Sequence, residues 1–162
     1  AAKGITTGCV PMGVVMVSDD VHDAFAQGPD NALDLFHGYT YSGHPLACAA
    51  ALATLVTYAE ENLFDKAIEL GDYWQEGIHS LKGLPNVIDI RNYGLIGAIE
   101  LAPRPGAPGT RAYDAFTRAF QEGNLLTRVT GDVIALSPPL ILEKSHIDRI
   151  FETLADTLRA TA

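Results

Sequence analysis

The chain reads HGYTYSGHP at residues 37–45, directly before an Ala-rich run at residues 46–58. Pro45 suits the first turn of a helix, because the N–H that proline lacks would have no partner there. Ser42 or Gly43 lies where a capping residue is expected. We therefore predict a polar turn followed by a helix over residues 46–58, and this is the most distinctive local motif of the chain.

A second motif lies upstream, where Lys3 stands in AKGITTG at residues 2–8. A lysine can form an imine with a carbonyl cofactor when its amine is partly desolvated and can lose its proton. A lone lysine is more often a solvated surface charge. Lys3 is therefore a candidate nucleophile only in combination with other motifs.

Composition and residue spacing argue against several classes of function. The 162 residues are 48% hydrophobic, which is enough for a buried core, and the formal net charge is −9 without clusters of Lys or Arg. This balance disfavours nucleic-acid and anionic-membrane partners. No apolar run approaches the roughly 20 residues that span a bilayer. The histidines lack the spacing of metal ligands, and Cys9 and Cys48 suggest a reducing compartment, so we expect a cytoplasmic protein without a metal.

The N-terminal part combines strand and helix patterns. The Val-rich run at 12–18 predicts a buried strand, residues 21–27 a short helix and residues 28–36 a loop. A boundary is expected near residue 60. Beyond it, apolar residues recur every three or four positions over 62–81, which predicts one amphipathic helix capped by Asn62.

The C-terminal part has the pattern of an α+β domain. Residues 87–91 and 95–101 predict an antiparallel pair, and residues 125–129 and 133–137 a second hairpin. Ser145 with Asp148 predicts the cap of a last helix, whose buried face carries residues spaced by three and four. Arg91, in an alternating strand, is interpreted as structural or solvated.

Three motifs occur in a familiar order: AKGITTG, then HGYTYSGHP, then LTRV at 126–129 followed by SPP at 137–139. With them the chain resembles the class III pyridoxal-phosphate aminotransferases, of fold type I. The stretch VIDIRNYGL at 87–95 is most similar to the ω-amino acid:pyruvate (β-alanine:pyruvate) branch. The resemblance implies an α/β fold, with 1–60 as the end of the large cofactor domain and 61–162 as a small α+β domain.

The resemblance also implies roles for single residues toward pyridoxal 5′-phosphate. Lys3 would be the Schiff-base lysine and would move the proton of the reaction. Thr40, with Tyr39 beside it, would bind the cofactor phosphate of the neighbouring subunit ahead of a helix N-terminus. Arg128 would recognise the carboxylate of the substrate through parallel N–H donors.

The implied reaction is a transaminase reaction that moves an amino group from an ω-amino acid or a primary amine to a keto acid such as pyruvate. The expected assembly is a homodimer or tetramer of a complete enzyme. The ring-binding residues of the family precede the lysine, so we expect an upstream segment to supply them. A non-catalytic interaction module, or another fold-type-I enzyme such as an aminomutase or decarboxylase, remains an alternative.

Overall fold

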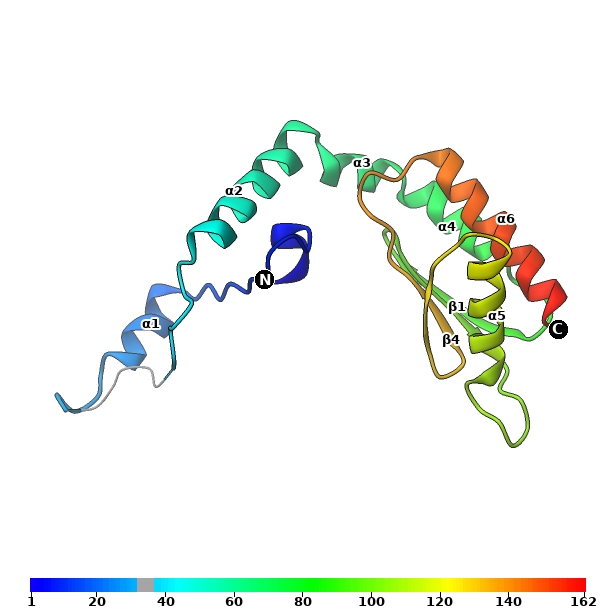
Figure 1. The fold of residues 1–162 in the computed structure, drawn as a ribbon, viewed down its shortest axis with the longest axis horizontal. Coiled ribbons are helices and arrows are strands. Elements are labelled where there is room, and N and C mark those ends of the chain that lie inside the picture. The colour runs from blue at the N-terminus through cyan, green and yellow to red at the C-terminus, as the bar shows by residue number, and fades with distance from the viewer. Residues whose placement is uncertain (32–36) are drawn as a thin grey trace. The chain divides into compact units, whose positions relative to one another are not determined.

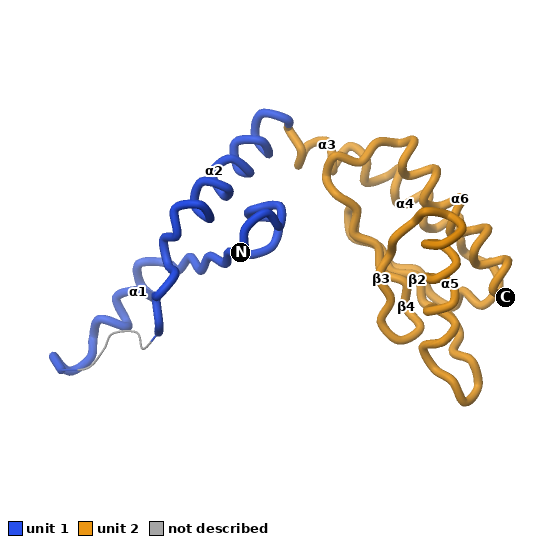
Figure 2. The backbone as a smooth tube through the Cα atoms, in the orientation of Figure 1, with its two compact units in different colours: residues 1–61 blue, residues 62–162 orange. Residues whose placement is uncertain are grey.

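A computed structural model describes residues 1–31 and 37–162 of the chain. It divides into two compact units, residues 1–61 and residues 62–162 (Figure 2). The predicted loop over 28–36 lies partly outside the described residues. Each unit is considered by itself below.

Unit 1 contains the short 3-10 helix η1 (Lys3–Thr6) and the helices α1 (Asp19–Phe25) and α2 (Pro45–Glu60) (Figure 1). Helix α2 confirms the prediction made from the Ala-rich run. Pro45 is its first residue as predicted, but the N-cap is His44 and not Ser42 or Gly43. Helix α2 packs against η1, so the HGYTYSGHP motif leads into the helix that supports the lysine-bearing turn.

The predicted buried strand over residues 12–18 is wrong for this structure. The segment makes an isolated antiparallel bridge between Gly13 and Ala2, and Val15 and Met16 are 90% and 83% exposed. A strand buried on both faces needs strands on either side and elements over each face. The described part of unit 1 offers no such strands, so the Val-rich pattern has nothing to pair with there.

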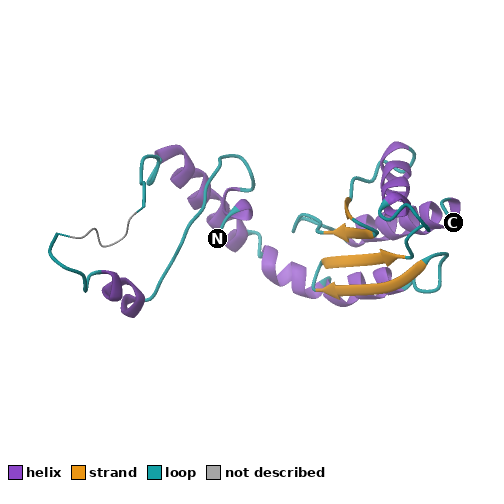
Figure 3. Cartoon of the chain, turned by 90° about the horizontal axis from the view of Figure 1, so that it is seen from below, coloured by secondary structure: helices purple, strands orange, loops and turns teal. Residues whose placement is uncertain are grey.

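Unit 2 is built on a four-stranded antiparallel sheet with the strand order β1-β2-β4-β3. Its strands are β1 (Val87–Tyr93), β2 (Ile96–Leu101), β3 (Arg128–Thr130) and β4 (Val133–Leu136), drawn in orange in Figure 3. Both predicted hairpins are confirmed. Each turn contains a glycine with positive φ, Gly94 in the first and Gly131 in the second, as tight strand connections favour.

Four helices accompany this sheet: α3 (Leu63–Glu69), α4 (Gly71–His79), α5 (Thr110–Gln121) and α6 (Lys144–Ala160). Helix α6 packs against both α4 and α5, α4 contacts β1, and α5 contacts β3 and β4. Along β2 the buried Ile99 and Leu101 alternate with the half-exposed Ala98 and Glu100. One face of the sheet is therefore covered by helices.

A single apolar core lies between this sheet and the helices. Its centre is Trp74 of α4, whose ring meets that of Phe151 of α6 edge-on, with 4.9 Å between centroids. Gly77 lies at the same contact, and a Cβ built there would be 2.4 Å from the Phe151 ring. Other fully buried members are Ile78, Leu81, Ile99, Leu101, Ile134, Ile147, Leu154 and Leu158.

Three details of the predicted helices are wrong. The helix expected over 62–81 is two helices, because the chain bends at Leu70 before Gly71, a poor helix former. Asn62 adopts a left-handed conformation and makes no side-chain cap. Helix α6 starts two residues earlier than expected, and Glu143 and His146 form its capping box in place of Ser145.

Candidate functional site

Lys3 is the first residue of η1 and has a left-handed backbone conformation, with φ of 57°. Among the described residues, three of the five non-glycine residues with positive φ are asparagines, which tolerate it. The other two are Lys3 and Thr7, the first and last residues of the turn over 3–7, which is called the lysine-bearing turn. Such conformations cluster at functional sites, where the surroundings hold them in place.

The turn around Lys3 is anchored at several points. The Thr6 side chain is buried, and its hydroxyl donates to the Val10 carbonyl at 2.6 Å. The Gly4 carbonyl accepts a hydrogen bond from the Tyr58 hydroxyl of α2 at 2.7 Å. The Lys3 side chain itself is exposed and makes no hydrogen bond or ion pair with any described residue. The structure thus combines a fixed backbone with a free amine.

Thr40 lies in the turn before α2 and lines a hollow of about 550 Å³ within unit 1. The first turn of α2 borders the same hollow through Ala47 and Cys48. His44 makes no side-chain cap, and no hydrogen bond of the Thr40 hydroxyl is found in the part of the chain that the structure describes. A free hydroxyl beside an uncapped helix N-terminus is a set of donors that suits a phosphate.

The structure does not bring the other predicted residues of unit 1 into this hollow. Tyr39 is 57% exposed and packs edge-on against His37, with 5.1 Å between ring centroids. Neither Tyr39 nor Lys3 lines the hollow that Thr40 borders. Their predicted roles toward the cofactor therefore stay predictions.

Arg128 belongs to unit 2, where it is the first residue of β3 and is exposed. Arg128 is paired with Ala135 of β4, and Ala135 is paired with Ala98 of β2. Ala98 is in turn paired with Arg91 of β1. Residues opposite one another share a face, so the two arginines flank two alanines in one row. Three strand spacings separate them by about 14 Å, too far to grip one carboxylate together.

The two arginines of this row have different electrostatic surroundings. Arg91 donates to Glu100 at 2.8 Å and also to Asp89, and these hydrogen bonds raise the pKa of its guanidinium. Arg91 is thus neutralised by its neighbours, in agreement with the structural role predicted for it. Arg128 has no carboxylate partner among the described residues and borders a hollow of about 350 Å³ with Thr127 and Ser137. Of the two, Arg128 is free to bind an anion.

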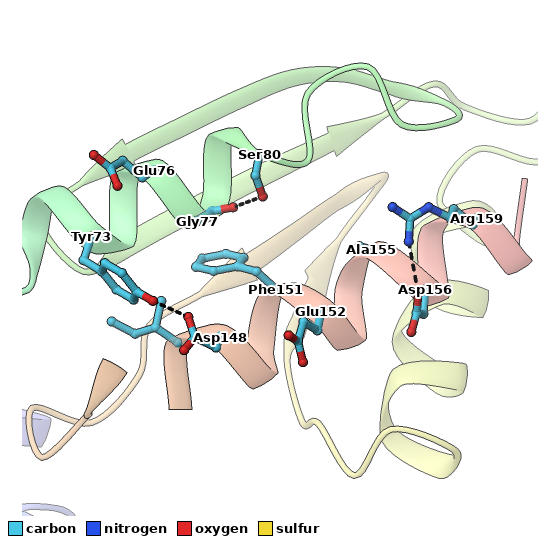
Figure 4. A pocket seen from close by; sticks show the side chains of 11 residues that line it. Tyr73, Glu76, Gly77, Ser80, Asp148, Phe151, Glu152, Ala155, Asp156 and Arg159 are labelled. Carbon is cyan, nitrogen blue, oxygen red and sulfur yellow. Dashed lines mark hydrogen bonds and ion pairs between the residues drawn. The ribbon is translucent and has the colours of Figure 1, made fainter. Parts of the chain in front are cut away.

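A further hollow of about 490 Å³ lies between α4 and α6, and none of the residues that line it was predicted to be a site residue (Figure 4). Tyr73 donates a hydrogen bond to Asp148 across it at 2.5 Å, and the Lys144 amine lies 5.0 Å from the centroid of the Tyr73 ring. Tyr73 and Asp148 are 75 residues apart. No local spacing could therefore have identified the pair.

The hydrogen bond to Asp148 raises the pKa of Tyr73 above its ordinary 10.0, and desolvation and nearby carboxylates add to the effect. Because the pKa of Tyr73 is higher in the folded than in the unfolded chain, the stabilisation from this bond is fully present below the pKa of the unfolded chain. It is lost as the pH rises through the pKa of the folded protein. We expect Asp148→Asn to return the pKa of Tyr73 toward 10.0. The measurement is an alkaline titration of tyrosinate absorbance, with Tyr73→Phe identifying the contribution of Tyr73.

The described ranges 1–31 and 37–162 contain no group of three or more His, Cys, Asp or Glu side chains that could hold a metal ion. None of the helices described is both long enough and apolar enough to cross a membrane.

Comparison with known proteins gives consistent matches over the whole chain. The family model for class III aminotransferases matches residues 1–158. An omega-aminotransferase of Caulobacter vibrioides is 58% identical over 97% of this chain, and a beta-alanine-pyruvate aminotransferase of Pseudomonas aeruginosa is 42% identical over 99%. In both cases the chain spans only 36% of the relative's length.

Solved structures agree with the sequence comparison. A thermostable (S)-enantioselective omega-transaminase from Thermomicrobium roseum superposes with a TM-score of 0.87 at 32% identity. The match covers 99% of this chain and 36% of that structure. The family match includes the motifs around Lys3, Thr40 and Arg128. The chain belongs to the class III aminotransferases.

Proposed function

We propose that the protein containing this chain is an aminotransferase that moves an amino group from an ω-amino acid or primary amine to a keto acid such as pyruvate. The observation that carries the proposal is the family match over residues 1–158, which includes the Lys3, Thr40 and Arg128 motifs in one chain. The names of the similar proteins from Caulobacter and Pseudomonas support this choice of donor and acceptor.

The residues present fit pyridoxal 5′-phosphate, the cofactor that this family uses. Among the described residues the Lys3 amine has no partner that would hold it back from an aldehyde, and the Thr40 hydroxyl, likewise unpaired there, lies beside the uncapped start of α2, where it suits a phosphate. When bound, the cofactor acts as an electron sink that makes a Cα proton of the substrate removable. A companion carboxylate for its ring nitrogen would come from a segment outside this chain.

Within this arrangement Lys3 supplies the nucleophilic amine and then moves a proton at its Nζ atom. Thr40 would donate a hydrogen bond from its hydroxyl to the phosphate, together with the N–H groups at the start of α2. Lys3 does not border the Thr40 hollow. The family resemblance assigns Thr40 to the site of a neighbouring subunit, so the proposed smallest active form is a dimer.

Arg128 is proposed to bind the carboxylate of the keto acid. We expect Arg128→Lys to raise the KM for pyruvate by about 10- to 100-fold, because an ammonium cannot reproduce two parallel charged hydrogen bonds. An amine donor without a carboxylate should keep its KM. Steady-state kinetics of the full-length protein with both substrates check this prediction. Arg149→Ala, at an exposed position of α6, is the control and should change neither constant.

The proposal is tested by trapping the amine that binds the cofactor. The full-length protein is incubated with pyridoxal phosphate, reduced with borohydride, and mapped by mass spectrometry of its peptides. A pyridoxyl group on the Lys3 peptide supports the proposal. Modification elsewhere, or none, would favour the non-catalytic interaction module.

Product analysis separates transamination from the other fold-type-I reactions. With pyruvate as acceptor, an aminotransferase produces alanine and the aldehyde or ketone of the donor in equal amounts. A decarboxylase would release carbon dioxide instead, and an aminomutase would return an isomer of the donor. Absence of alanine would therefore reject the proposed reaction even if Lys3 carries the cofactor.

A further inference from the structure

Helix α2 packs against η1 and buries one stripe of its surface. The stripe consists of the buried Ala47, Ala51 and Thr54 and the half-buried Tyr58. These positions are spaced by four, three and four residues, as one face of a helix requires. Small residues over most of the stripe allow η1 to pack closely on α2. Tyr58 is the long side chain of the stripe, and its hydroxyl extends to the turn.

The Tyr58 hydroxyl is bonded to the backbone of the residue that follows Lys3. It donates to the Gly4 carbonyl at 2.7 Å, a contact between residues 54 positions apart. The same carbonyl accepts the Thr7 N–H at 3.2 Å, the bond that closes the turn. A Cβ at Gly4 would lie 3.3 Å from the hydroxyl oxygen, a tight contact that a side chain at this position could make only if the tyrosine shifted by a few tenths of an ångström.

The backbone of Lys3 must be held in its conformation by contacts such as this hydrogen bond. Its φ of 57° lies in the left-handed region, which a lysine adopts only where the surroundings hold it. On one side of Lys3, the bridge between Ala2 and Gly13 fixes the chain. On the other side, the bond from Tyr58 ties Gly4 to α2. The conformation of Lys3 is thus held between a backbone bridge and one tyrosine hydroxyl.

We propose that Tyr58 is a positioning residue for Lys3. Through its bond to the Gly4 carbonyl, Tyr58 holds the turn in the conformation from which the Lys3 amine reacts with a carbonyl compound. Tyr58 does not itself take part in the chemistry. The inference rests on the proposed function of Lys3 and adds the residue that keeps its turn in place.

The test uses the cofactor-free full-length protein and pyridoxal as the probe, trapped by borohydride at successive times. Peptide mapping gives the rate of modification of Lys3 relative to the exposed Lys82 in the same molecules. Tyr58→Phe removes only the hydroxyl, and we expect the relative Lys3 rate to fall about two- to tenfold, the effect of one hydrogen bond. Tyr113→Phe, at an exposed tyrosine of α5, should leave the ratio unchanged.

A double-mutant cycle assigns the effect to the bond itself. Gly4→Ala places a Cβ against the Tyr58 hydroxyl and should also lower the relative Lys3 rate. In the Tyr58→Phe protein the hydroxyl is absent, so the same change at position 4 should have little further effect. Independent, multiplicative effects of the two substitutions would overturn the proposal.

Amide hydrogen exchange gives a readout that does not depend on the amine. The Thr7 N–H should exchange faster in Tyr58→Phe than in the wild-type protein, because its acceptor carbonyl loses its anchor. An unchanged Lys3 rate and unchanged Thr7 exchange would contradict the role of Tyr58 while leaving Lys3 as the reactive amine. A wild-type protein in which Lys3 reacts no faster than Lys82 would instead contradict the proposed function.

Discussion

Replacing Lys3 by alanine is expected to lower the turnover number for amine transfer by at least about 10³-fold in the full-length protein. The change removes the nucleophile and the proton carrier together, since both roles are assigned to one amine. The uncatalysed reaction of free amines with pyruvate sets the lowest rate that the assay can assign to the protein. The assay follows alanine production from pyruvate at saturating donor.

Two further variants make this result interpretable. Lys3→Arg keeps a positive charge at the same place but cannot supply a neutral amine, so it should be as inactive as Lys3→Ala. Lys82→Ala changes an exposed lysine of unit 2 and should retain wild-type turnover. A Lys3→Ala protein that turns over at a rate close to wild type would exclude Lys3 from the chemistry.

Leu154→Ala is expected to destabilise unit 2 by about 2–5 kcal/mol. Leu154 is fully buried on α6, within the core that also contains Trp74 and Phe151. The substitution removes apolar contacts and leaves a cavity, because a packed core relaxes only in part. This is a large share of the stability of a domain of this size.

Urea unfolding followed by tryptophan fluorescence measures the change. Trp74 is the only tryptophan of the chain and is fully buried in unit 2, so the signal reports the unfolding of this core. Leu126→Ala is the matched control, since Leu126 is 70% exposed and its loss should cost less than about 0.5 kcal/mol. Equal midpoints for Leu154→Ala and the control would show that the core described here does not hold unit 2 together.

The elements that sequence patterns predicted correctly depend on nearby residues. The two hairpins of unit 2 are set by alternation and by a glycine-containing turn, and α2 by Pro45 and the Ala-rich run that follows. The strand expected over 12–18 does not form in this structure, because its apolar pattern specifies a buried strand only where neighbouring strands can pair with it. The predicted helix caps failed because Glu143 with His146 caps α6 in place of Ser145, and because Asn62 is left-handed and makes no side-chain cap.

For the candidate site, sequence motifs selected residues but not their contacts. Lys3, Thr40 and Arg128 were identified by their motifs. The structure adds that Thr40 borders an uncapped helix start, and that Arg128 has no carboxylate partner in the described part of the chain. The bond from Tyr58 to Gly4 was missed because its partners are 54 residues apart. The pair of Tyr73 and Asp148 was missed for the same reason.

The core of unit 2 has a consequence for protein engineering. All of its members come from residues 62–162, so the packing of this core uses no residue of unit 1. Arg128 lies in this unit, whereas Lys3 and Thr40 lie in unit 1. Chimaeras joined at residue 62 would exchange the proposed recognition of the acceptor between class III enzymes while keeping the amine chemistry of the host.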